Sequence, residues 1–329
     1  MKAAWYSRNG DAHDVITVGE QPTPRPEAGQ VRVRLATSGV NPSDVKSRQH
    51  RPVPNGLCVP HSDGAGIIDA VGAGVDQALV GRRVWVWNGQ WQRALGTCAE
   101  YIVVPQSQAV PLPDTTDYAA GACLGIPALT ACRAVQLLGD IQGKTILVSG
   151  ASSSVGFYAT QLAALAGARV IGTVGSPEKA ALAQKAGAAH TILYKTEPVL
   201  DIVKEHTGGR GADAMIDMDF SATAGLLGQG LVAPHGVVAC YGANVLGDIP
   251  FPFRSLLFAS ISLHLFLVYE LLPADRAAAI AQLTALLEAD KLMHAIGARY
   301  SLEETAKAHV AVEQGRTMGN IVIDIDKNI

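Results

Sequence analysis

Six small residues between an apolar run and a helical pattern are the part of this chain best suited to bind phosphate. They read Ala151-Ser-Ser-Ser-Val-Gly156 and follow the apolar residues 145–149. Small residues let a backbone approach a phosphate closely, and a helix N-terminus adds unpaired N–H groups and positive potential. With a second predicted strand at 168–173 they complete a β-α-β unit, where a parallel sheet binds the pyrophosphate of a dinucleotide.

The dinucleotide fingerprint G-x-G-x-x-G is degraded in this turn. It reads Ala151-x-Ser153-x-x-Gly156, so only the third glycine remains. A plain strand–turn–helix explains the motif as well as a cofactor site does. The predicted pyrophosphate contacts are Ala151, Ser152, Ser153, Ser154, Val155 and Gly156.

The end of the second strand favours NADPH over NADH. NAD sites place an acidic residue there to bind the ribose 2′-hydroxyl, but this chain has Val174. Ser176 and Lys179 follow, and a hydroxyl and an ammonium group can hold a 2′-phosphate that an acid would repel. Ser176 can also cap the next helix, with Pro177 at its first position. The two roles are compatible.

Composition excludes several classes of protein. The chain has 329 residues, is 48% hydrophobic and 17% charged, and carries a formal charge of −3. Without a basic run, nothing indicates nucleic-acid binding. The five scattered cysteines resemble core residues of a reducing compartment. A strand begins close to Met1, so no signal peptide is visible, and the apolar stretch 256–268 is too short and polar to span a bilayer. We expect a cytoplasmic protein without membrane contact.

Two kinds of pattern divide the chain. Residues 1–120 are β-rich, with period-two alternation at 30–35 and 81–87 and turn clusters between the runs. Residues 117–138 are alanine-rich and helical in composition, and apolar strands then alternate with helices. The predicted strands are 145–149, 168–173, 190–193, 213–218 and 235–241, and the predicted helices are 156–166, 177–187, 197–207 and 221–230. This alternation predicts a doubly wound parallel sheet with helices on both faces.

The remaining segments extend both parts. Residues 249–268 predict one further strand of the parallel sheet, and a helix follows over 273–290. The β-like stretch 320–325 is expected to return to the β-rich domain.

Several motifs, in order along the chain, are similar to those of one family. They are Gly39-Val-Asn-Pro-Ser-Asp44, Val59-Pro-His-Ser-Asp-Gly-Ala-Gly66, Ala70-Val-Gly-Ala-Gly-Val75, Gly121-Ala-Cys-Leu-Gly-Ile-Pro-Ala-Leu-Thr-Ala131, Ala233-Pro-His-Gly-Val-Val-Ala-Cys-Tyr-Gly242 and Gly315-Arg-Thr-Met-Gly319. Over nearly its whole length the chain resembles the zinc-independent quinone oxidoreductases, the zeta-crystallin type, of the medium-chain dehydrogenase/reductase superfamily.

The resemblance implies a fold, a cofactor and an assembly. The fold would be α/β, with a Rossmann NADPH-binding domain at 123–268 and a GroES-like β-rich domain formed by 1–122 and 269–329. It also implies homodimers or tetramers and reduction of quinones by NADPH.

The resemblance also implies that no metal is bound. Zinc-dependent relatives carry ligands where this chain has Ser38 or Asn41, Ser62 beside Asp63, and roughly Ile126. A catalytic zinc needs three protein ligands, and none assembles here. His61 is displaced by one position and is expected to be a loop or pocket-wall residue.

Three departures from the family pattern affect the site. Lys46 stands where the family commonly has a tyrosine near the active site, Ser153-Ser154 where it usually has two glycines, and Asn320 where it commonly has a lysine. The first leaves the substrate open. Serine hydroxyls can themselves donate to phosphate, and Asn320 is kept among the predicted cofactor contacts.

The predicted catalytic residues of the β-rich domain are Asn41, Asp44 and Lys46. The Asn41 amide can donate to a substrate carbonyl or fix the ribose–nicotinamide end, although Asn-Pro also favours a plain turn. Asp44 can orient Lys46 or a ribose hydroxyl, or cap the following helix. Lys46 can stabilise a developing oxyanion, or it is a solvated surface lysine.

The nucleotide domain supplies the remaining predicted contacts. Thr130 lies in a segment that the resemblance places under the nicotinamide, although a helix-interior threonine can bond back to a carbonyl. Tyr194 resembles the family tyrosine beside the 2′-phosphate. Gly242 and Ala243 follow a strand at the carboxyl edge of the sheet, where ligands collect. The candidate walls for a flat substrate are Tyr6, Trp87, Trp91 and Phe266, and Phe266 is also a predicted cofactor contact.

Three functions remain open from the sequence. The first is an NADPH-dependent quinone reductase, which needs no protein acid because water can protonate the product oxyanion. The second is an enone or alkenal reductase, which needs an acid such as Lys46 to protonate carbon. The third is a non-catalytic NADPH-binding protein. The active-site cleft is expected between the two domains.

Overall fold

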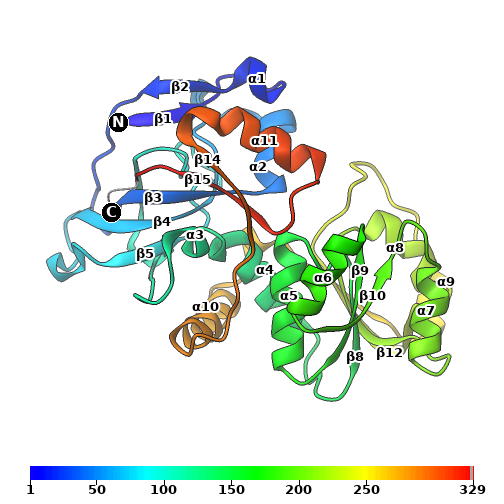
Figure 1. Ribbon diagram of the computed structural model, residues 1–329. Helices are drawn as coiled ribbons and strands as arrows, with labels where there is room; N and C mark the ends of the chain where they lie inside the picture. Colours follow the sequence, from blue (N-terminus) through cyan, green and yellow to red (C-terminus); the bar gives the residue numbers. More distant parts are fainter. Residues whose placement is uncertain (327–328) are drawn as a thin grey trace. The chain divides into compact units, whose positions relative to one another are not determined.

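The chain forms two compact units (Figure 1). The computed structural model describes residues 1–326 and 329. Unit 1 comprises Met1–Ile126 and Thr284–Ile329, and unit 2 comprises Pro127–Leu283. A β-rich unit and a unit built on a six-stranded parallel sheet agree with the expected α/β fold class.

Unit 1 is built on a seven-stranded sheet with the order β14-β15-β3-β4-β5-β7, in which β6 also pairs with β3. The strands are β3 (Gln30–Val40), β4 (Asp63–Val71), β5 (Arg83–Val86), β6 (Tyr101–Pro105), β7 (Ala109–Pro111), β14 (Ile296–Ser301) and β15 (Asn320–Asp324), with a separate pair, β1 (Lys2–Trp5) and β2 (Thr17–Glu20). β15 runs antiparallel to β3, with Ile323 opposite Ser38. The C-terminal stretch therefore returns to the β-rich unit, as expected.

The helices of unit 1 exceed what the β-rich pattern predicts. They are α1 (Ala12–Val15), α2 (Pro42–His50), α3 (Tyr118–Gly121) and α11 (Thr305–Gln314). α2 forms because Asn41 and Asp44 make a capping box around Pro42, a residue suited to the first helical turn. This helix is important for the site because it begins at Asn41.

Unit 2 is a parallel sheet of six strands in the order β10-β9-β8-β11-β12-β13. The strands are β8 (Thr145–Val148), β9 (Arg169–Val174), β10 (Ala188–Leu193), β11 (Ala212–Asp217), β12 (Val232–Cys240) and β13 (Ser262–Leu265). The helices are α4 (Leu129–Leu137), α5 (Ser154–Leu165), α6 (Pro177–Lys185), α7 (Val199–His206), α8 (Phe220–Leu227), α9 (Phe253–Phe258) and α10 (Pro273–Glu288). Figure 1 shows α4, α5 and α6 on one side of this sheet and α7, α8 and α9 on the other. The strand order reverses beside β8, which is where such sheets bind ligands.

Two details of unit 2 differ from the sequence prediction. The predicted strand at 249–268 is confined to β13 and follows the short helix α9, because Pro250 and Pro252 cannot donate to a strand ladder. The boundaries between the units fall after residues 126 and 283 rather than after 122 and 268. Most of α10 belongs to unit 2, where the Asp275 carboxylate pairs with Arg133 of α4 at 2.8 Å and Gln136 Nε2 donates to Gln282 Oε1 at 3.0 Å.

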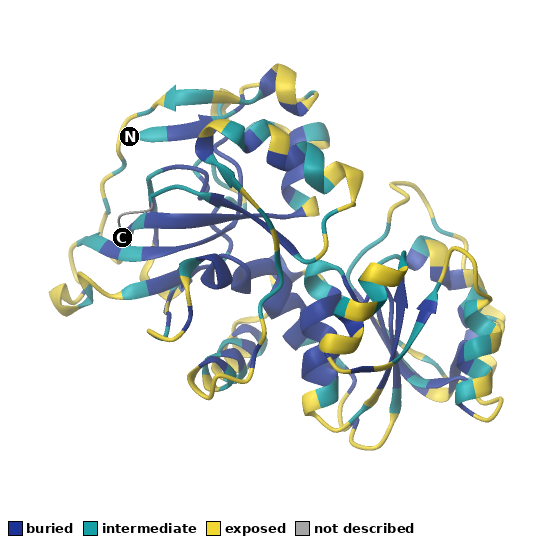
Figure 2. Ribbon diagram, viewed as in Figure 1, coloured by how far each residue is buried: buried dark blue, intermediate teal, exposed yellow. Residues whose placement is uncertain are grey.

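Apolar side chains from the strands fill the cores of both units. Figure 2 shows that β8, β9, β11 and β12 of the unit 2 sheet are mostly buried and that the outward faces of its helices are exposed. The core between this sheet and α8 includes Ile171, Met215, Val238 and Leu227. The five cysteines are buried, free thiols. In the described part of the chain, no helix has both the length and the apolar character needed to cross a membrane.

Candidate active site

The turn between β8 and α5 has the geometry of a phosphate-binding turn. Ser153 is the N-cap of α5, and its Oγ accepts the N–H of Gly156 at 3.0 Å. A Cβ at Gly156 would lie 2.1 Å from the carbonyl oxygen of Gly150, so only glycine fits where the helix packs against the turn. Ser154 and Val155 form the start of the first turn of α5, and the backbone N–H groups of a first turn point towards the N-terminal end of the helix.

A neighbouring glycine explains why alanine replaces the first glycine of the fingerprint. The Ala151 methyl group packs against Gly172 of β9. A Cβ on Gly172 would lie only 2.5 Å from this methyl group. Gly172 therefore provides the space that Ala151 occupies. The turn is also fixed to β9, because the Ala151 N–H donates to the Thr173 carbonyl at 3.0 Å and the Gly150 N–H donates to Thr173 Oγ1 at 3.0 Å. The degraded fingerprint thus keeps its shape through a compensating residue on the adjacent strand.

The side chains of Tyr194 and Lys195 form a corner with the backbone at the carboxyl end of β9. Val174, at the position usual for an acid, is buried. The next residue is Gly175, and a Cβ there would lie 3.5 Å from the ring and hydroxyl of Tyr194 and 3.7 Å from Cε of Lys195. Tyr194 is exposed and follows β10, and its N–H donates to the Val174 carbonyl at 3.2 Å. An aromatic hydroxyl and an ammonium side chain therefore flank this corner.

Ser176 and Lys179 lie at the start of α6, beside this corner in sequence. Ser176 is the N-cap of the helix, and its Oγ accepts the N–H of Lys179 at 3.4 Å. The capping role that the sequence suggested for Ser176 is confirmed. We name Gly175, Ser176, Lys179, Tyr194 and Lys195 the β9 corner.

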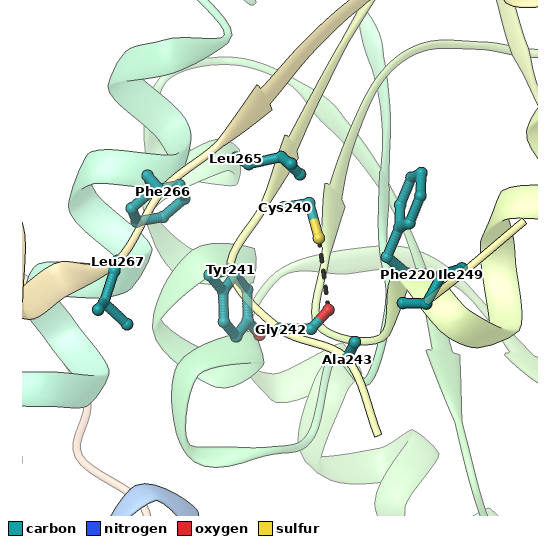
Figure 3. Close-up of a pocket in the computed structure, with 9 residues that line it drawn as sticks. All are labelled: Phe220, Cys240, Tyr241, Gly242, Ala243, Ile249, Leu265, Phe266 and Leu267. Atoms are coloured by element: carbon teal, nitrogen blue, oxygen red, sulfur yellow. Dashed lines mark hydrogen bonds between the residues drawn. The ribbon is translucent and has the colours of Figure 1, made fainter. Parts of the chain in front are cut away.

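A pocket of about 430 Å³ lies at the carboxyl ends of β12 and β13. Its lining residues are Phe220, Cys240, Tyr241, Gly242, Ala243, Ile249, Leu265, Phe266 and Leu267. In Figure 3, Tyr241 and Phe266 lie on one side of the pocket and Phe220 and Ile249 on the other. The sequence-predicted contacts Gly242, Ala243 and Phe266 therefore come together at one mostly apolar site.

A buried carboxylate holds the ends of β8 and β11 together near this pocket. Asp217 accepts hydrogen bonds from Ser149 Oγ at 2.8 Å and from Thr223 Oγ1 at 2.5 Å. Burial raises the pKa of Asp217, while these hydroxyl donors oppose the shift. Ser149 Oγ in turn accepts the N–H of Met218 at 2.7 Å. These bonds fix the backbone at the carboxyl edge of the sheet.

Asn41 lies at the N-terminus of α2, buried in unit 1. Its backbone N–H donates to Asp44 Oδ2 at 2.8 Å, and its side-chain Nδ2 donates to Asp63 Oδ2 at 2.8 Å. Asp63 Oδ2 also accepts the N–H of Ile126 at 2.9 Å. The backbone N–H and the side-chain Nδ2 of Asn41 therefore both donate to buried carboxyl groups, and these bonds fix the orientation of the side-chain amide.

The other three predicted catalytic residues, Asp44, Lys46 and Thr130, occupy different environments. Asp44 is buried and acts as a helix cap, and burial raises its pKa to about 7. Lys46 is exposed on α2. Thr130 is buried in α4 and belongs to unit 2. Of the two readings for Asp44, the structure supports the cap.

A buried chain of hydrogen bonds runs behind Asp63. Thr97 Oγ1 donates to the Asp63 carbonyl at 2.6 Å, and Ser38 Oγ lies 2.8 Å from Thr97 Oγ1 and 2.9 Å from His61 Nδ1. His61 Nε2 lies 3.0 Å from His309 Nε2. His61 lies in the loop before β4, which is one of the two expected places, and its side chain is fully buried.

The direction of this chain follows from its first donor. Because the Thr97 hydrogen goes to Asp63, Thr97 can only accept from Ser38, and His61 Nδ1 must then donate to Ser38. Burial lowers the pKa of His61 to about 3 and that of His309 well below its ordinary value, so both rings are neutral. His309 Nε2–H therefore donates to His61 Nε2. His309 Nδ1 is left without a hydrogen-bond partner among the described residues.

Two further predictions concern metal and Asn320. Within residues 1–326 and 329, no three His, Cys, Asp or Glu side chains are grouped to hold a metal ion. Asn320 is buried in unit 1, and its Nδ2 donates to the Ala295 carbonyl at 3.1 Å. Its amide supports the start of β15, so we do not carry it into the proposed cofactor site.

Sequence reasoning missed three residues. Lys195 directly follows the predicted contact Tyr194. Because both residues come just after β10, the sequence could have predicted Lys195 as a second contact. Asp63 stands in the motif Val59–Gly66, but only the folded chain shows that it holds Asn41. His309 has no signal in the sequence, because it is an isolated histidine on α11.

Family models match both units. Residues 27–114 match the family described as the alcohol dehydrogenase GroES-like domain, and residues 154–288 match the family described as zinc-binding dehydrogenase. The quinone oxidoreductase of Pseudomonas aeruginosa is 32% identical over 312 residues, which cover 92% of each chain.

Solved structures resemble the whole chain. A structure named as an NAD-dependent alcohol dehydrogenase superposes with a TM-score of 0.87 at 28% identity, covering 99% of this chain and 100% of its own. A mycobacterial protein solved in complex with NADPH superposes with a TM-score of 0.85 at 27% identity and the same coverage.

Proposed function

The chain belongs to the zeta-crystallin-type quinone oxidoreductases of the medium-chain dehydrogenase/reductase superfamily, and from this premise we propose that it reduces quinones with NADPH by direct hydride transfer. NADPH, when bound, supplies the hydride from its nicotinamide ring. The residues of this chain bind and orient the reactants. Quinones accept hydride readily, so no metal or strong protein acid is needed in the proposed reaction.

The β9 corner carries the choice of NADPH. Val174 stands where an acid would repel a 2′-phosphate, and the side chains of Tyr194 and Lys195 lie beside Gly175, the next residue. Charge-assisted hydrogen bonds to phosphate are among the strong ones, so Lys195 and Lys179 favour the phosphorylated cofactor. Val174 in place of an acid, with the side chains of Tyr194 and Lys195 beside Gly175, is the single observation on which the cofactor assignment rests.

The rest of the cofactor site follows the carboxyl edge of the unit 2 sheet. The amides at the start of α5 bind the pyrophosphate, supported by the cap that Ser153 provides. Gly242, Ala243 and Phe266 bind the nicotinamide end at the apolar pocket. Thr130 completes the proposed contacts of unit 2 as a hydroxyl near the nicotinamide.

Asn41 is the proposed catalytic residue of unit 1. One hydrogen of its Nδ2 is committed to Asp63, and we assign the other to the acceptor carbonyl or the nicotinamide ribose. The burial of Asn41 makes such a donor effective, because competing water is excluded. Water protonates the reduced product oxygen. Asp44 acts through the helix cap and does not touch the substrate.

The alternative substrate class is an enone or alkenal. Its reduction requires a proton on carbon, and Lys46 of α2 is the acid that this chain offers. The exposure of Lys46 makes it a weak choice for an acid that must work away from water. Quinone reduction, which needs no such group, is the better supported function.

NADPH oxidation distinguishes these functions. The purified protein is given NADPH with a panel of quinones, a panel of enones and no acceptor, while absorbance at the nicotinamide band is followed. We expect rapid oxidation with quinones and slow oxidation with enones. Oxidation with enones alone would favour the second function, and the same slow rate in all three cases would indicate a non-catalytic NADPH-binding protein.

We also propose that two copies associate through β13. This strand ends the sheet order of unit 2 and presents an outer backbone edge without a strand partner in the described chain. Leu265 on β13 is 69% exposed, and Phe258 of the adjacent α9 is 74% exposed. An apolar sheet edge invites pairing with another strand, and a two-fold contact between identical edges closes at the dimer.

A further inference from the structure

The Asp63 carboxyl group is completely buried at the start of β4, and one of its oxygens accepts two hydrogen bonds. Oδ2 accepts Asn41 Nδ2 at 2.8 Å and the Ile126 N–H at 2.9 Å. The other oxygen, Oδ1, has no hydrogen-bond partner among the described residues. A Cβ at Gly125 would lie 2.2 Å from Oδ1, so the glycine backbone packs directly against this side of the carboxyl group.

The environment of Asp63 favours a neutral acid. Burial raises the pKa of Asp63 well above its ordinary range, and the nearby Asp44 carboxyl raises it further, while the two N–H donors act in the opposite direction. No salt bridge to Asp63 occurs in the described residues. Because Oδ2 already accepts two hydrogen bonds, a bound proton belongs on Oδ1.

The backbone of Asp63 is held as firmly as its side chain. Its carbonyl accepts the Thr97 hydroxyl, which is the end of the directed chain that begins at His309. β4 also pairs with β3 at this point, where Gly39 lies opposite Asp63. The carboxyl oxygen that meets Asn41 therefore has a fixed position.

We propose that Asp63 is a positioning residue that acts through Asn41. Oδ2 of Asp63 holds the Asn41 amide with its nitrogen inward, which prevents a flip of the amide and directs the second N–H of Nδ2. The role is that of a neutral hydrogen-bond acceptor rather than a charge or a proton donor. This inference rests on the proposed function, because it requires that Asn41 contacts the substrate or cofactor.

Four variants test the proposal: Asp63→Asn, Asp63→Ala, Asn41→Ala and the double variant Asn41→Ala/Asp63→Ala. An asparagine keeps a neutral carbonyl oxygen of the same size, so Asp63→Asn is expected to retain kcat within about threefold. Asp63→Ala removes the acceptor and is expected to lower kcat tenfold or more with little change in NADPH Kd, measured by fluorescence titration. The double variant is expected to have the same kcat as Asn41→Ala, because both substitutions remove the same function.

Thr305→Val is a matched control for the loss of a buried hydrogen bond in unit 1. The Thr305 hydroxyl is fully buried and donates to the Leu302 carbonyl at 2.7 Å. This variant is expected to lower the unfolding temperature and to leave kcat unchanged. If Asp63→Ala does not fold, Asp63→Ser replaces it, since a serine side chain is too short to reach Asn41 Nδ2.

The outcomes separate this inference from the proposed function. An unchanged kcat in Asp63→Ala, together with a loss in Asn41→Ala, would overturn the positioning role and leave the proposed function intact. An equal loss in Asp63→Asn and Asp63→Ala would show that the carboxyl group itself is required and would also overturn it. An unchanged kcat in Asn41→Ala would refute the catalytic role of Asn41 and the inference with it.

Discussion

Asn41 Nδ2 donates to Asp63 Oδ2 at 2.8 Å, although 22 residues separate the two side chains in the sequence. The bond joins the N-cap of α2 to the first residue of β4. It gives the asparagine a role that a plain Asn-Pro turn does not have. An amide buried beside a carboxyl group is pre-oriented, and such preorganisation is what a donor to developing charge requires.

Replacement of Asn41 by alanine is expected to lower turnover with a quinone. If the amide stabilises charge in the transition state, the loss should approach ~2–4 kcal/mol, the range for a removed oxyanion donor. If it only positions the reactants, the loss should be smaller and appear mainly in KM for the quinone. Steady-state kinetics with saturating NADPH distinguishes the two cases. NADPH affinity should stay within a few fold, because the β9 corner and the phosphate turn are unchanged.

Lys46→Met tests the substrate class. Lys46 is exposed on α2, and water can protonate a reduced quinone, so a quinone reductase should keep kcat/KM within about twofold. An enone reductase that uses Lys46 as its acid should lose most of its activity, and the remaining rate should depend differently on pH. The measurement is the pH profile of kcat/KM for one quinone and one enone. A large loss with the quinone would contradict the proposal that water supplies the proton.

The β9 corner predicts a specific effect of Lys195. Lys195→Ala removes a charged side chain beside Gly175 and should weaken NADPH binding by on the order of 1.5–3 kcal/mol. NADH binding should be unaffected, since NADH has no 2′-phosphate. Titration with both cofactors gives the two values. Lys185→Ala, at the other end of α6 from Ser176, is the matched control and should change neither. Equal affinity of the native protein for NADH and NADPH would contradict the cofactor assignment.

The sequence was sufficient for the architecture of unit 2. Apolar runs separated by helical patterns predicted the bounds of its first five strands within three residues, since most of these strands are buried in the sheet. The further strand expected within 249–268 is present as β13, but it occupies only Ser262–Leu265, and α9 precedes it. Hydrophobicity alone does not distinguish a short buried strand from a short helix whose side chains pack into the same core.

Contacts between distant segments could not be predicted. The loss of the first fingerprint glycine appeared to weaken the phosphate turn, yet Gly172 on the next strand makes space for Ala151. Asp63 appeared as one acid in a family motif, but its bond to Asn41 depends on how β4 lies beside the start of α2. Such compensations depend on tertiary packing and leave no local pattern in the chain.

The β13 edge predicts a dimer that a single charge should disrupt. Leu265→Glu places a carboxylate on the exposed side of this strand and is expected to give monomers in sedimentation velocity at micromolar concentration. Leu165→Glu is the control, because Leu165 is 52% exposed at the end of α5, far along the sheet order from β13. The control should sediment like the native protein. Native protein that is monomeric at the same concentration would rule out the proposed contact.

The buried pair of His61 and His309 predicts how stability depends on pH. Both rings have folded pKa values below that of an unfolded histidine, about 6.5. The unfolded chain therefore binds protons first as pH falls, so the stability associated with these rings is full above pH ~6.5 and is lost as pH falls towards their folded pKa values. At one unit below 6.5 the loss is about 1.4 kcal/mol for each ring. Asp44 acts in the opposite direction, because its raised pKa of about 7 makes the folded state bind a proton first.

His309→Gln isolates the histidine contribution from that of Asp44. Glutamine keeps a donor for His61 Nε2 but does not titrate. Urea unfolding at pH 7.5 and pH 5.5 gives the free energy of unfolding of both proteins. The native protein should lose about 1.4 kcal/mol relative to the variant between these two pH values, because only the native chain carries the second titrating ring. Asp44 contributes equally to both proteins and cancels in the difference. A difference between the two proteins that is the same at both pH values would show that His309 is not held neutral in the fold, and the direction assigned to the hydrogen bonds from His309 to Asp63 would then be wrong.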